Sequence, residues 1–476
     1  MNIPVARPLF AWDCLEDSPS LQTVRQFLHS LPDGKLLDAL RRGRGKGRND
    51  YPVTALWGTV LLKPLLRHTS MEACLGELRR NAGLRALIGI DCEAKVPRKW
   101  NVSRFEVVLG SPPYVDMMHE IFDSMVQALA VAVPDLGQSV SGDSSSLSCH
   151  AAASPNKHGL PEPDGGKKEY TDEKGNIVRV LKWFGYKFHM LVDTRHEVAL
   201  SYRVSSATRH DSQELPAMLT QARINLGDDV ENKPDVSRIQ TLAYDKAADD
   251  EETHAMLNAA NILPLIENRS LWKTDHERML DGHDGTSNVV YDEAGTLFCY
   301  DKVSDPPVRH KMSYIGLEKK RGTLKYRCPA MHEGWTCPSQ NRCNEGLRYG
   351  KCARIKREQD LRRFPPIPRA TKQFERLYKG RTASERVNAR IKLFWGADDG
   401  NLTGAPRFHA MLGAAMIAHI GLATLLAATP RREGTLGKTT LGKTTLGKTT
   451  LGQTNLSPIA KALHVANASR ATQPMA

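Results

Sequence analysis

Strand-type and helix-type segments alternate between residues 138 and 267, and this alternation constrains the fold more than any other feature of the chain. GQSVSGDSSSLSC resembles a strand, and WFGYKFHMLVD and HEVALSYRV alternate apolar and polar residues around a turn, which predicts a β-hairpin. Residues 211–226 and 248–260 have helical patterns, whereas IQTLAYD and ILPLIE are typical of short buried strands. The order predicts an α/β sheet with Asp143 and Asp245 on strand segments, and a surface loop at 150–176.

The segments on either side of this sheet have different patterns. Residues 1–135 are predicted to be helical, and many turn residues at 268–370 predict a β-rich insertion. Residues 371–428 then supply a helix that carries Glu385 and a strongly apolar closing helix. We therefore predict an α/β domain in two parts, 136–267 and 371–428, which is interrupted by the insertion and preceded by a helical domain.

The segment YKGRTASERVNARIK, which runs from Tyr378 to Lys392, has the spacing of an amphipathic helix. At about 100° per residue, Arg381, Glu385 and Lys392 fall within about 60° of one another and of Tyr378. Apolar residues occupy the other side of the same helix. One interpretation of the polar face is a surface ion pair between Arg381 and Glu385. The other is a functional site that Glu385 forms with distant acids.

Three carboxylates that are far apart in the sequence can meet in such a fold. Asp143 and Asp245 lie on segments that can run side by side in a sheet, and the Glu385 helix can lie across their ends. Three converging carboxylates suit hard divalent cations, which take oxygen ligands. Two such ions can assist an in-line phosphoryl displacement. We therefore predict that these acids are metal ligands, and we prefer this role for Glu385 to the ion pair.

The charge of the chain points to a polyanionic partner. The net charge is +13 and the pI is about 9.3, so nucleic acid is the first candidate and a membrane surface the second. No stretch approaches the roughly 20 apolar residues that span a bilayer. The N-terminus has no apolar signal-peptide core. We expect a cytoplasmic protein that binds double-stranded DNA and no membrane.

A basic run, RRGRGKGR, lies in the helical N-terminal part. Its glycines predict a flexible loop that lies over DNA phosphates. The side chains predicted to contact the phosphates are Arg41, Arg42, Arg44, Lys46 and Arg48. Helical spacing follows the run, and Thr69 and Glu72 have the spacing of a capping box that opens a further helix. Two short helices joined by a turn are compatible with a helix-turn-helix and equally with a small helical bundle. We predict DNA binding by this part.

Four of the nine cysteines cluster in the insertion: Cys328, Cys337, Cys343 and Cys352. Nine cysteines in a chain of this length do not indicate a secreted disulfide scaffold. The cluster lacks the closely paired cysteines that are typical of structural zinc sites. Reduced thiols are therefore the preferred interpretation, and structural zinc at these four residues is the alternative.

Residues 429–476 form a low-complexity tail that contains tandem TLGKT pentads. Two overlapping segments match the phosphate-loop pattern G-x4-G-K-T. No buried strand precedes them, and repetition of a pentad that contains GKT produces the match by itself. We therefore expect a disordered tail without a nucleotide site.

Tyr378, Arg381, Glu385 and Lys392 resemble the Tyr-Arg-Glu-Lys signature of DDE transposases from bacterial insertion sequences. SGDSSSL and LAYDKAADD are similar to the blocks around the first and second aspartates of that family, although Ala247 and Ala248 stand where many relatives have a glycine and an aromatic residue. The resemblance covers most of residues 40–428.

This resemblance implies an RNase H-like catalytic domain that cleaves DNA at terminal inverted repeats and joins the freed 3′-hydroxyl ends to target DNA. It makes Asp143, Asp245 and Glu385 the metal ligands, with Mg²⁺ the first candidate and Mn²⁺ the alternative, and Tyr378, Arg381 and Lys392 the contacts to the DNA backbone near the cleaved end. It also implies a homodimer in the synaptic complex. Some relatives use an insertion tryptophan to stabilise a DNA hairpin, for which Trp272 and Trp335 are candidates. A catalytically silent DNA-binding derivative and a nuclease without strand transfer remain the alternatives.

Overall fold

The computed structural model describes residues 19–45, 50–150, 159–172, 176–274, 276–280, 288–301, 303–398 and 403–428. The predicted tail at 429–476 lies outside the described residues, as do Lys46 and Arg48 of the basic run.

A mixed sheet forms the centre of the protein. Its strands are β1 (Ser139–Ser148), β3 (Ile177–Asp193), β4 (Val198–Ser206), β5 (Thr241–Tyr244) and β6 (Leu263–Ile266). β3 pairs with β1 and β4 in antiparallel fashion, whereas β1, β5 and β6 are parallel. Parallel neighbours need a crossover, and the crossovers contain the helices α9 (Asp211–Asn225) and α10 (Glu251–Ala259). The expected mixed α/β architecture is confirmed.

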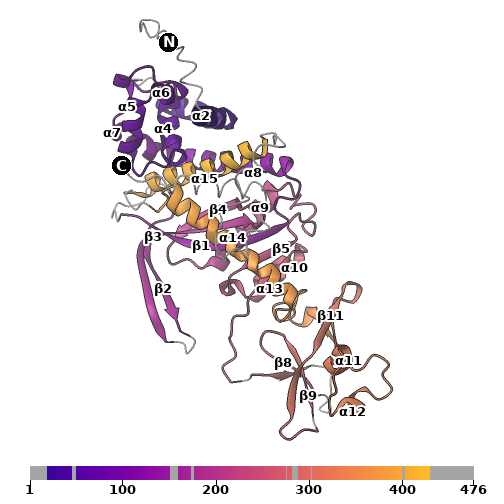
Figure 1. Ribbon diagram of the computed structural model, residues 1–476. Helices are drawn as coiled ribbons and strands as arrows, with labels where there is room; N and C mark the ends of the chain where they lie inside the picture. The colour runs from indigo at the N-terminus through magenta and orange to yellow at the C-terminus, as the bar shows by residue number, and fades with distance from the viewer. Residues whose placement is uncertain are drawn as a thin grey trace, which may run out of the picture.

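A two-stranded ribbon leaves this sheet where a surface loop was predicted. β3 is 17 residues long, and its first half continues beyond the sheet, where β2 (Asp164–Thr171) pairs with it. Figure 1 shows β2 extending away from the rest of the molecule. The predicted loop at 150–176 was therefore wrong for its second half, because the polar, glycine-containing sequence does not have the apolar alternation by which a strand is recognised.

Seven helices precede the sheet in the described part of the chain: α2 (Pro19–Ser30), α3 (Gly34–Arg44), α4 (Val53–Leu65), α5 (Met71–Arg80), α6 (Ala82–Leu87), α7 (Lys99–Leu109) and α8 (Tyr114–Ala132). One hydrophobic core runs without a break from these helices into the sheet, and it includes Leu62, Phe122, Val140 and Phe188. The cap of α5 is Ser70, which accepts a hydrogen bond from the backbone of Ala73, and not Thr69 as the capping-box spacing suggested.

The closing helix α15 (Ala405–Ala428) lies between the N-terminal helices and the sheet (Figure 1). Residues 405–427 are long and apolar enough to cross a membrane by length and composition, which corrects the expectation that no stretch approaches this limit. Most of this helix is buried inside the protein, however, where it packs on α8, α7 and α4. The core helix of a soluble protein passes the same test.

The segment between β6 and the Glu385 helix forms two small sheets. The first contains β7 (Arg278–Met279), β8 (Val289–Tyr291), β9 (Leu297–Asp301) and β10 (Val308–Lys311), and the second contains β11 (Ser313–Glu318), β12 (Thr323–Arg327) and β13 (Cys352–Lys356). Two short helices, α11 (Pro329–Glu333) and α12 (Gln340–Asn344), join β12 to β13. This part has its own hydrophobic core, built around Leu297, Leu324, Tyr326 and Ile355.

Glu106 of α7 makes the stability of this fold depend on pH. Burial raises the pKa of Glu106 to about 7, and the nearby charges of Lys63 and Arg407 oppose the shift only in part. The folded protein therefore holds a proton that the unfolded chain releases above a pH of about 4.5, so stability falls as the pH rises from there to about 7. We expect wild type to lose up to about 3 kcal/mol of unfolding free energy over this range relative to Glu106→Gln.

Guanidinium denaturation of both proteins at a series of pH values measures this difference. The variant removes the titrating group and keeps the size of the side chain, so the gap between the two proteins must change with pH. A gap that stays constant between these pH values would show that Glu106 titrates normally.

Candidate active site

Asp143 lies on β1, and Asp245 directly follows β5, the parallel strand next to it. In the register of β1 and β5, Ser139 is opposite Thr241 and Ser141 is opposite Ala243. Asp143 follows Ser141 by two residues on β1, and Asp245 follows Ala243 by two residues just beyond the end of β5, so the two aspartates lie at neighbouring positions at this end of the strands. The hydroxyls of Ser139 and Thr241, four residues before the two aspartates, are 2.9 Å apart. The fold therefore brings together two acids that are 102 residues apart in the sequence.

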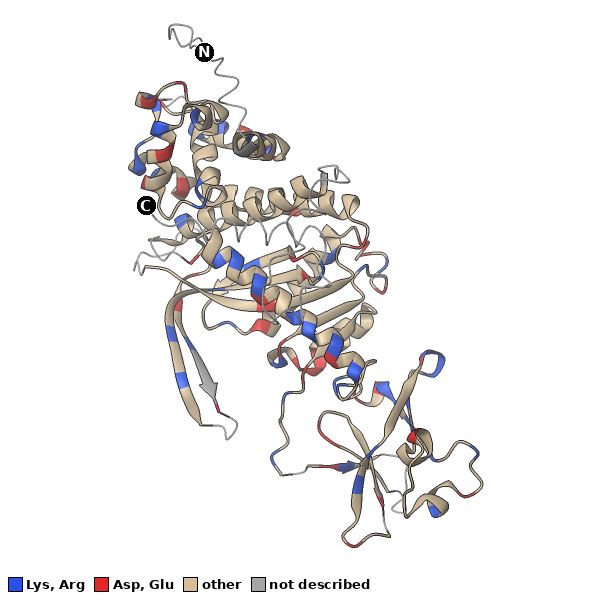
Figure 2. Cartoon of the chain, viewed as in Figure 1, with Lys and Arg blue, Asp and Glu red and all other residues tan. Residues whose placement is uncertain are grey.

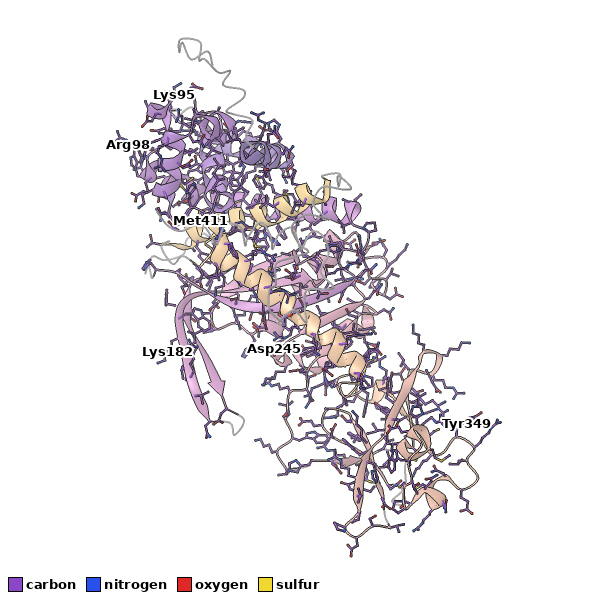
Figure 3. All side chains as sticks on the ribbon, viewed as in Figure 1. Lys95, Arg98, Lys182, Asp245, Tyr349 and Met411 are labelled. Carbon is purple, nitrogen blue, oxygen red and sulfur yellow. The ribbon has the colours of Figure 1, made fainter. Side chains whose placement is uncertain are left out.

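Glu385 lies on a helical rod that changes its hydrogen bonding along its length. The rod consists of α13 (Lys372–Tyr378), a 3-10 turn (Lys379–Arg381), α14 (Thr382–Ala389) and a π-helical turn (Arg390–Phe394). The backbone stays right-handed helical at each junction, and in Figure 3 Asp245 lies beside the rod. The prediction assumed one uniform α-helix, and the π turn rotates the residues after Ala389 away from the positions expected at 100° per residue.

A buried ion pair holds the rod on the sheet. Glu197, at the turn between β3 and β4, is fully buried, and its carboxylate lies 2.6 Å from Arg386 Nε and 2.7 Å from Arg390 Nη2. Burial lowers the pKa of Arg390, and the Glu197 carboxylate opposes that shift. Asn388, between the two arginines, donates a hydrogen bond of 3.2 Å to Asp143 Oδ2. These contacts fix the position of Glu385 relative to β1.

Glu385 forms the ion pair that we had set aside. Arg381 Nη2 lies 2.7 Å from Glu385 Oε1, one helical turn apart, with about half of the Glu385 side chain exposed. The ion pair is therefore present, and the role of Glu385 as a metal ligand stays a prediction. The physical reason is local, because residues four apart on a helix are always neighbours, and this pair forms whether or not distant acids also approach.

Arg381 also faces the other two acids. Burial lowers its pKa, but Tyr378 and the carboxylates of Glu385, Asp143 and Asp245 outweigh burial, so that the net pKa shift of Arg381 is upward. One guanidinium thus experiences all three carboxylates at once. The negative charges of all three acids therefore act on Arg381, although the three carboxylates do not stand close enough together to hold one metal ion.

The donor set at this region suits a hard divalent cation in kind, because all three groups are carboxylates. Asp143 and Asp245 are half-buried and side by side. Among the residues that the structure describes, no three His, Cys, Asp or Glu side chains stand close enough together to hold one metal ion. The Glu385 carboxylate is instead paired with the Arg381 guanidinium.

Tyr378 and Lys392 lie at opposite ends of the rod and have different surroundings. Burial raises the pKa of Tyr378 to about 12, and the neighbouring Glu267 adds to the shift. Lys392 Nζ donates to the backbone carbonyl of Ser146 at 2.6 Å and lies 3.0 Å from Asp398. Lys392 therefore ties the rod to the end of β1, a contact that sequence spacing did not predict.

Sequence reasoning missed a second buried carboxylate close to the site. Asp249, four residues after Asp245, has no exposed side-chain surface. It lies 2.9 Å from Arg362 Nη2 and 2.7 Å from Arg369 Nη2, and it accepts a hydrogen bond from the backbone of Arg269. Arg269 begins the insertion, and the two arginines end it. Asp249 thus joins both ends of the insertion to the sheet, and the sequence contained no signal for this beyond a cluster of acids.

The basic run near residue 41 is helical where the structure describes it. Arg41, Arg42 and Arg44 occupy the last turn of α3, which corrects the predicted loop. Basic side chains are favourable at a helix C-terminus, where backbone carbonyls carry partial negative charge. Gly43 is required for packing, because a Cβ there would lie 2.1 Å from the Tyr114 hydroxyl.

The cysteine cluster has a different membership from the predicted one. Cys299 of β9 lines the same cavity as Cys328, Cys337 and Cys343, and burial raises the pKa of Cys299 to about 12, with the other three thiols adding to the shift. Cys352 instead contacts the backbone carbonyl of Gly350. The described residues contain no group close enough to hold a metal ion, so the structure does not support zinc.

The two candidate tryptophans pack within the insertion. The guanidinium groups of Arg278 and Arg363 lie over the Trp272 ring at 4.3 and 5.0 Å. Trp335 packs against His310, with 4.9 Å between ring centroids. A role for either residue at a DNA hairpin stays a prediction.

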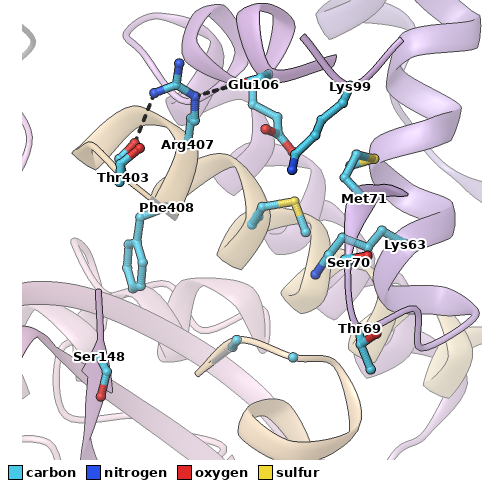
Figure 4. A pocket seen from close by; sticks show the side chains of 14 residues that line it. Lys63, Thr69, Ser70, Met71, Lys99, Glu106, Ser148, Thr403, Arg407 and Phe408 are labelled. Atoms are coloured by element: carbon cyan, nitrogen blue, oxygen red, sulfur yellow. Dashed lines mark hydrogen bonds between the residues drawn. The ribbon is translucent and has the colours of Figure 1, made fainter. Parts of the chain in front are cut away.

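A cavity of about 280 Å³ lies away from the carboxylates, between the N-terminal helices and α15 (Figure 4). Glu106, Lys63, Lys99 and Arg407 line it together with apolar side chains. Ser148, at the far end of β1 from the sheet centre, is the β1 residue that reaches it. The cavity therefore does not form part of the carboxylate site.

One comparison with known proteins identifies a related family. A family model described as "Transposase DDE domain" matches residues 143–420, which is more than half of the chain. The matched range begins at Asp143 and includes Asp245 and the rod. No curated protein matches the sequence.

The Glu197 ion pair predicts a large loss of stability on substitution. Glu197→Ala leaves Arg390, of which about 2% is exposed, buried without a counter-charge, and we expect it to lower the unfolding free energy by about 3 kcal/mol or more. Glu375→Gln breaks the exposed pair with Lys379 on the same rod and serves as the matched control, with little expected change. Urea denaturation measures both. Similar small effects for the two variants would contradict an anchoring role for Glu197.

Proposed function

The chain belongs to the family of transposases with a DDE domain, and on that premise we propose that it is an active DNA transposase. It cleaves DNA at the terminal inverted repeats of its own element and joins the freed 3′-hydroxyl ends to target DNA. The sheet order, with three antiparallel strands followed by two parallel ones, is consistent with an RNase H-like domain.

The observation that carries this proposal is the meeting of β1, β5 and the Glu385 rod. Asp143 lies on β1, Asp245 directly follows β5, and the 3-10 turn of the rod contacts both strands. Asp143 and Asp245 are held side by side by the strand register, and Glu385 is held next to them by the anchored rod. A silent descendant that only binds DNA would have no need to keep three acids of like charge in one place. Their mutual repulsion destabilises the fold unless cations offset it.

Asp143, Asp245 and Glu385 are the residues that would hold Mg²⁺ or Mn²⁺. When bound, the ions supply activation of the attacking oxygen and stabilisation of the leaving oxygen at the phosphorus atom. For Glu385 to take part, its carboxylate must leave Arg381, and because the pair is partly exposed the cost of separation is small.

Arg381 and Tyr378 then hold the DNA strand. The guanidinium that leaves Glu385 is placed to bind a backbone phosphate in bidentate fashion, and the Tyr378 hydroxyl stays protonated as a hydrogen-bond donor, because its pKa is raised to about 12. Lys392 contributes by holding the rod on β1, and a contact from it to DNA would require it to release Ser146. The DNA partner, the synaptic homodimer and the contribution of Arg41, Arg42 and Arg44 are part of the same proposal.

Substitution of the three acids tests the catalytic assignment. We expect Asp143→Asn, Asp245→Asn and Glu385→Gln each to reduce cleavage to background, because each removes a negative charge from the site and keeps the shape of the side chain. The assay uses labelled duplexes that carry the DNA flanking the coding region, with Mg²⁺ and then with Mn²⁺. Electrophoretic mobility shifts measure DNA binding by the same proteins, which should persist.

Glu375→Gln is the control, since it removes an exposed acid from the same rod and should leave cleavage unchanged. Cleavage that survives Glu385→Gln would remove Glu385 from the catalytic set. Wild type that binds the duplexes and cleaves none of them would favour the silent derivative, and cleavage without joining would favour the nuclease.

Competition between Arg381 and metal for Glu385 gives a further prediction. Arg381→Gln frees the Glu385 carboxylate and removes a like charge from beside the cation, so we expect Mn²⁺ to bind about tenfold more tightly in the absence of DNA, a gain of about 1.4 kcal/mol. Isothermal titration calorimetry measures the affinity. The same variant should cleave DNA more slowly, because it lacks the phosphate contact. Weaker Mn²⁺ binding in the variant would contradict the competition.

A further inference from the structure

The positive charge of the protein is unevenly distributed along the sequence. Residues 268–370 contain 20 lysines and arginines against 13 acidic residues, whereas residues 136–267 contain 14 against 20. The sheet that carries two of the acids is thus negative, and the insertion is strongly positive. Figure 2 shows lysines and arginines spread over the insertion.

Within the insertion, the β11–β12–β13 sheet separates apolar from basic side chains. Leu324 and Tyr326 of β12, and Ala353 and Ile355 of β13, point into the insertion core. The alternate residues project from the opposite face, because successive side chains in a strand point to opposite sides. These outward residues include four bases: Lys325, Arg327, Arg354 and Lys356.

The register places these bases next to one another. Lys325 is directly opposite Arg354, and Thr323 is opposite Lys356. Like charges in directly opposite positions destabilise a sheet. Glu318 is the only acid in the three strands, all of which the structure describes, and it is shared by Arg354 at 3.2 Å, Lys325 at 3.9 Å and Arg321 at 3.9 Å. One carboxylate offsets only part of the positive charge that gathers on this face.

Three more bases extend the same surface. Lys319, Lys320 and Arg321 form the exposed turn that joins β11 to β12. Gly322, in the left-handed conformation with φ of 60°, closes the turn. The turn and the two strands together present a strip of positive charge, which we call the basic face: Lys319, Lys320, Arg321, Lys325, Arg354 and Lys356. Arg327 is left out, because its guanidinium donates to the backbone carbonyl of Tyr349.

We propose that the basic face is a binding surface for the backbone of double-stranded DNA. Adjacent strands are about 4.8 Å apart and alternate residues about 6.6 Å apart, so the cations form a close array that matches a closely spaced row of phosphates. The contact is to phosphate and carries no sequence preference. The inference rests on the proposed function only in taking DNA as the partner.

The attachment of the insertion makes this surface useful to the active site. Asp249 binds both ends of the insertion and lies four residues from Asp245. Arg357, directly after β13, also donates to Asn258 of α10 at 3.0 Å. DNA held on the basic face is therefore held in a fixed relation to the three carboxylates.

Two charge-removal variants test the proposal. The first is Lys319→Gln/Lys320→Gln/Arg321→Gln, and the second is Lys325→Gln/Arg354→Gln/Lys356→Gln. The matched control removes the same charge from exposed positions outside the insertion and outside the helical part that is predicted to bind DNA: Lys182→Gln/Lys233→Gln/Lys372→Gln. Thermal melting checks that each protein is folded. Fluorescence anisotropy with a labelled duplex of random sequence then measures Kd over a range of salt concentrations.

We expect each basic-face variant to weaken binding at least about tenfold at constant salt, and to lower the slope of log K against log salt by about 2 to 3, since each lost phosphate contact removes about one unit. The control should change neither by a comparable amount. Wild-type affinity and slope in both variants would overturn the basic face and leave the transposase proposal intact. Failure of wild type to bind any duplex would overturn the proposed function itself.

Discussion

The buried carboxylate of Glu197 is the constraint on which the arrangement of the site depends. It lies at a tight turn, with its own backbone in the left-handed region at φ of 54°, and two arginines one helical turn apart bind it. A charge that is removed from water has few acceptable partners, so the rod has one position on the sheet. Glu385 directly precedes the first of these arginines, and its place above β1 and β5 follows from theirs.

In the proposed function, different parts of the protein hold DNA and act on it. The half of the sheet domain that contains two of the acids has an excess of negative charge, and the insertion has an excess of positive charge. Phosphates are therefore repelled by the region of the carboxylates except where Arg381 and bound cations offset the charge. With this division, substitutions in the insertion would change the affinity for DNA, and substitutions at the carboxylates would change the rate of cleavage.

Local sequence patterns were sufficient for the central sheet strands and the Glu385 helix, but they missed β2 and the end of α3 and did not predict the contacts between elements. Alternation of apolar residues placed Asp143 in a strand and Asp245 at the end of one, and helical spacing placed Glu385 on a helix. The predicted positions of the residues after Ala389 around that helix were wrong, because the sequence does not reveal where a helix changes to the hydrogen bonding of a π turn. Cys299 joined the cysteine cluster from another sheet, a proximity that depends on packing and not on spacing. Asp249 had no distinguishing pattern at all.

The Asp249 junction has a mechanical consequence. Two arginines and a backbone amide from the ends of the insertion contact the Asp249 side chain. A single 3-10 turn, Lys246–Ala248, separates Asp249 from Asp245. The ends of the insertion are therefore joined through one buried acid to the chain segment that carries Asp245. In the proposed function, the part of the protein that holds DNA is thereby tied to a carboxylate of the site.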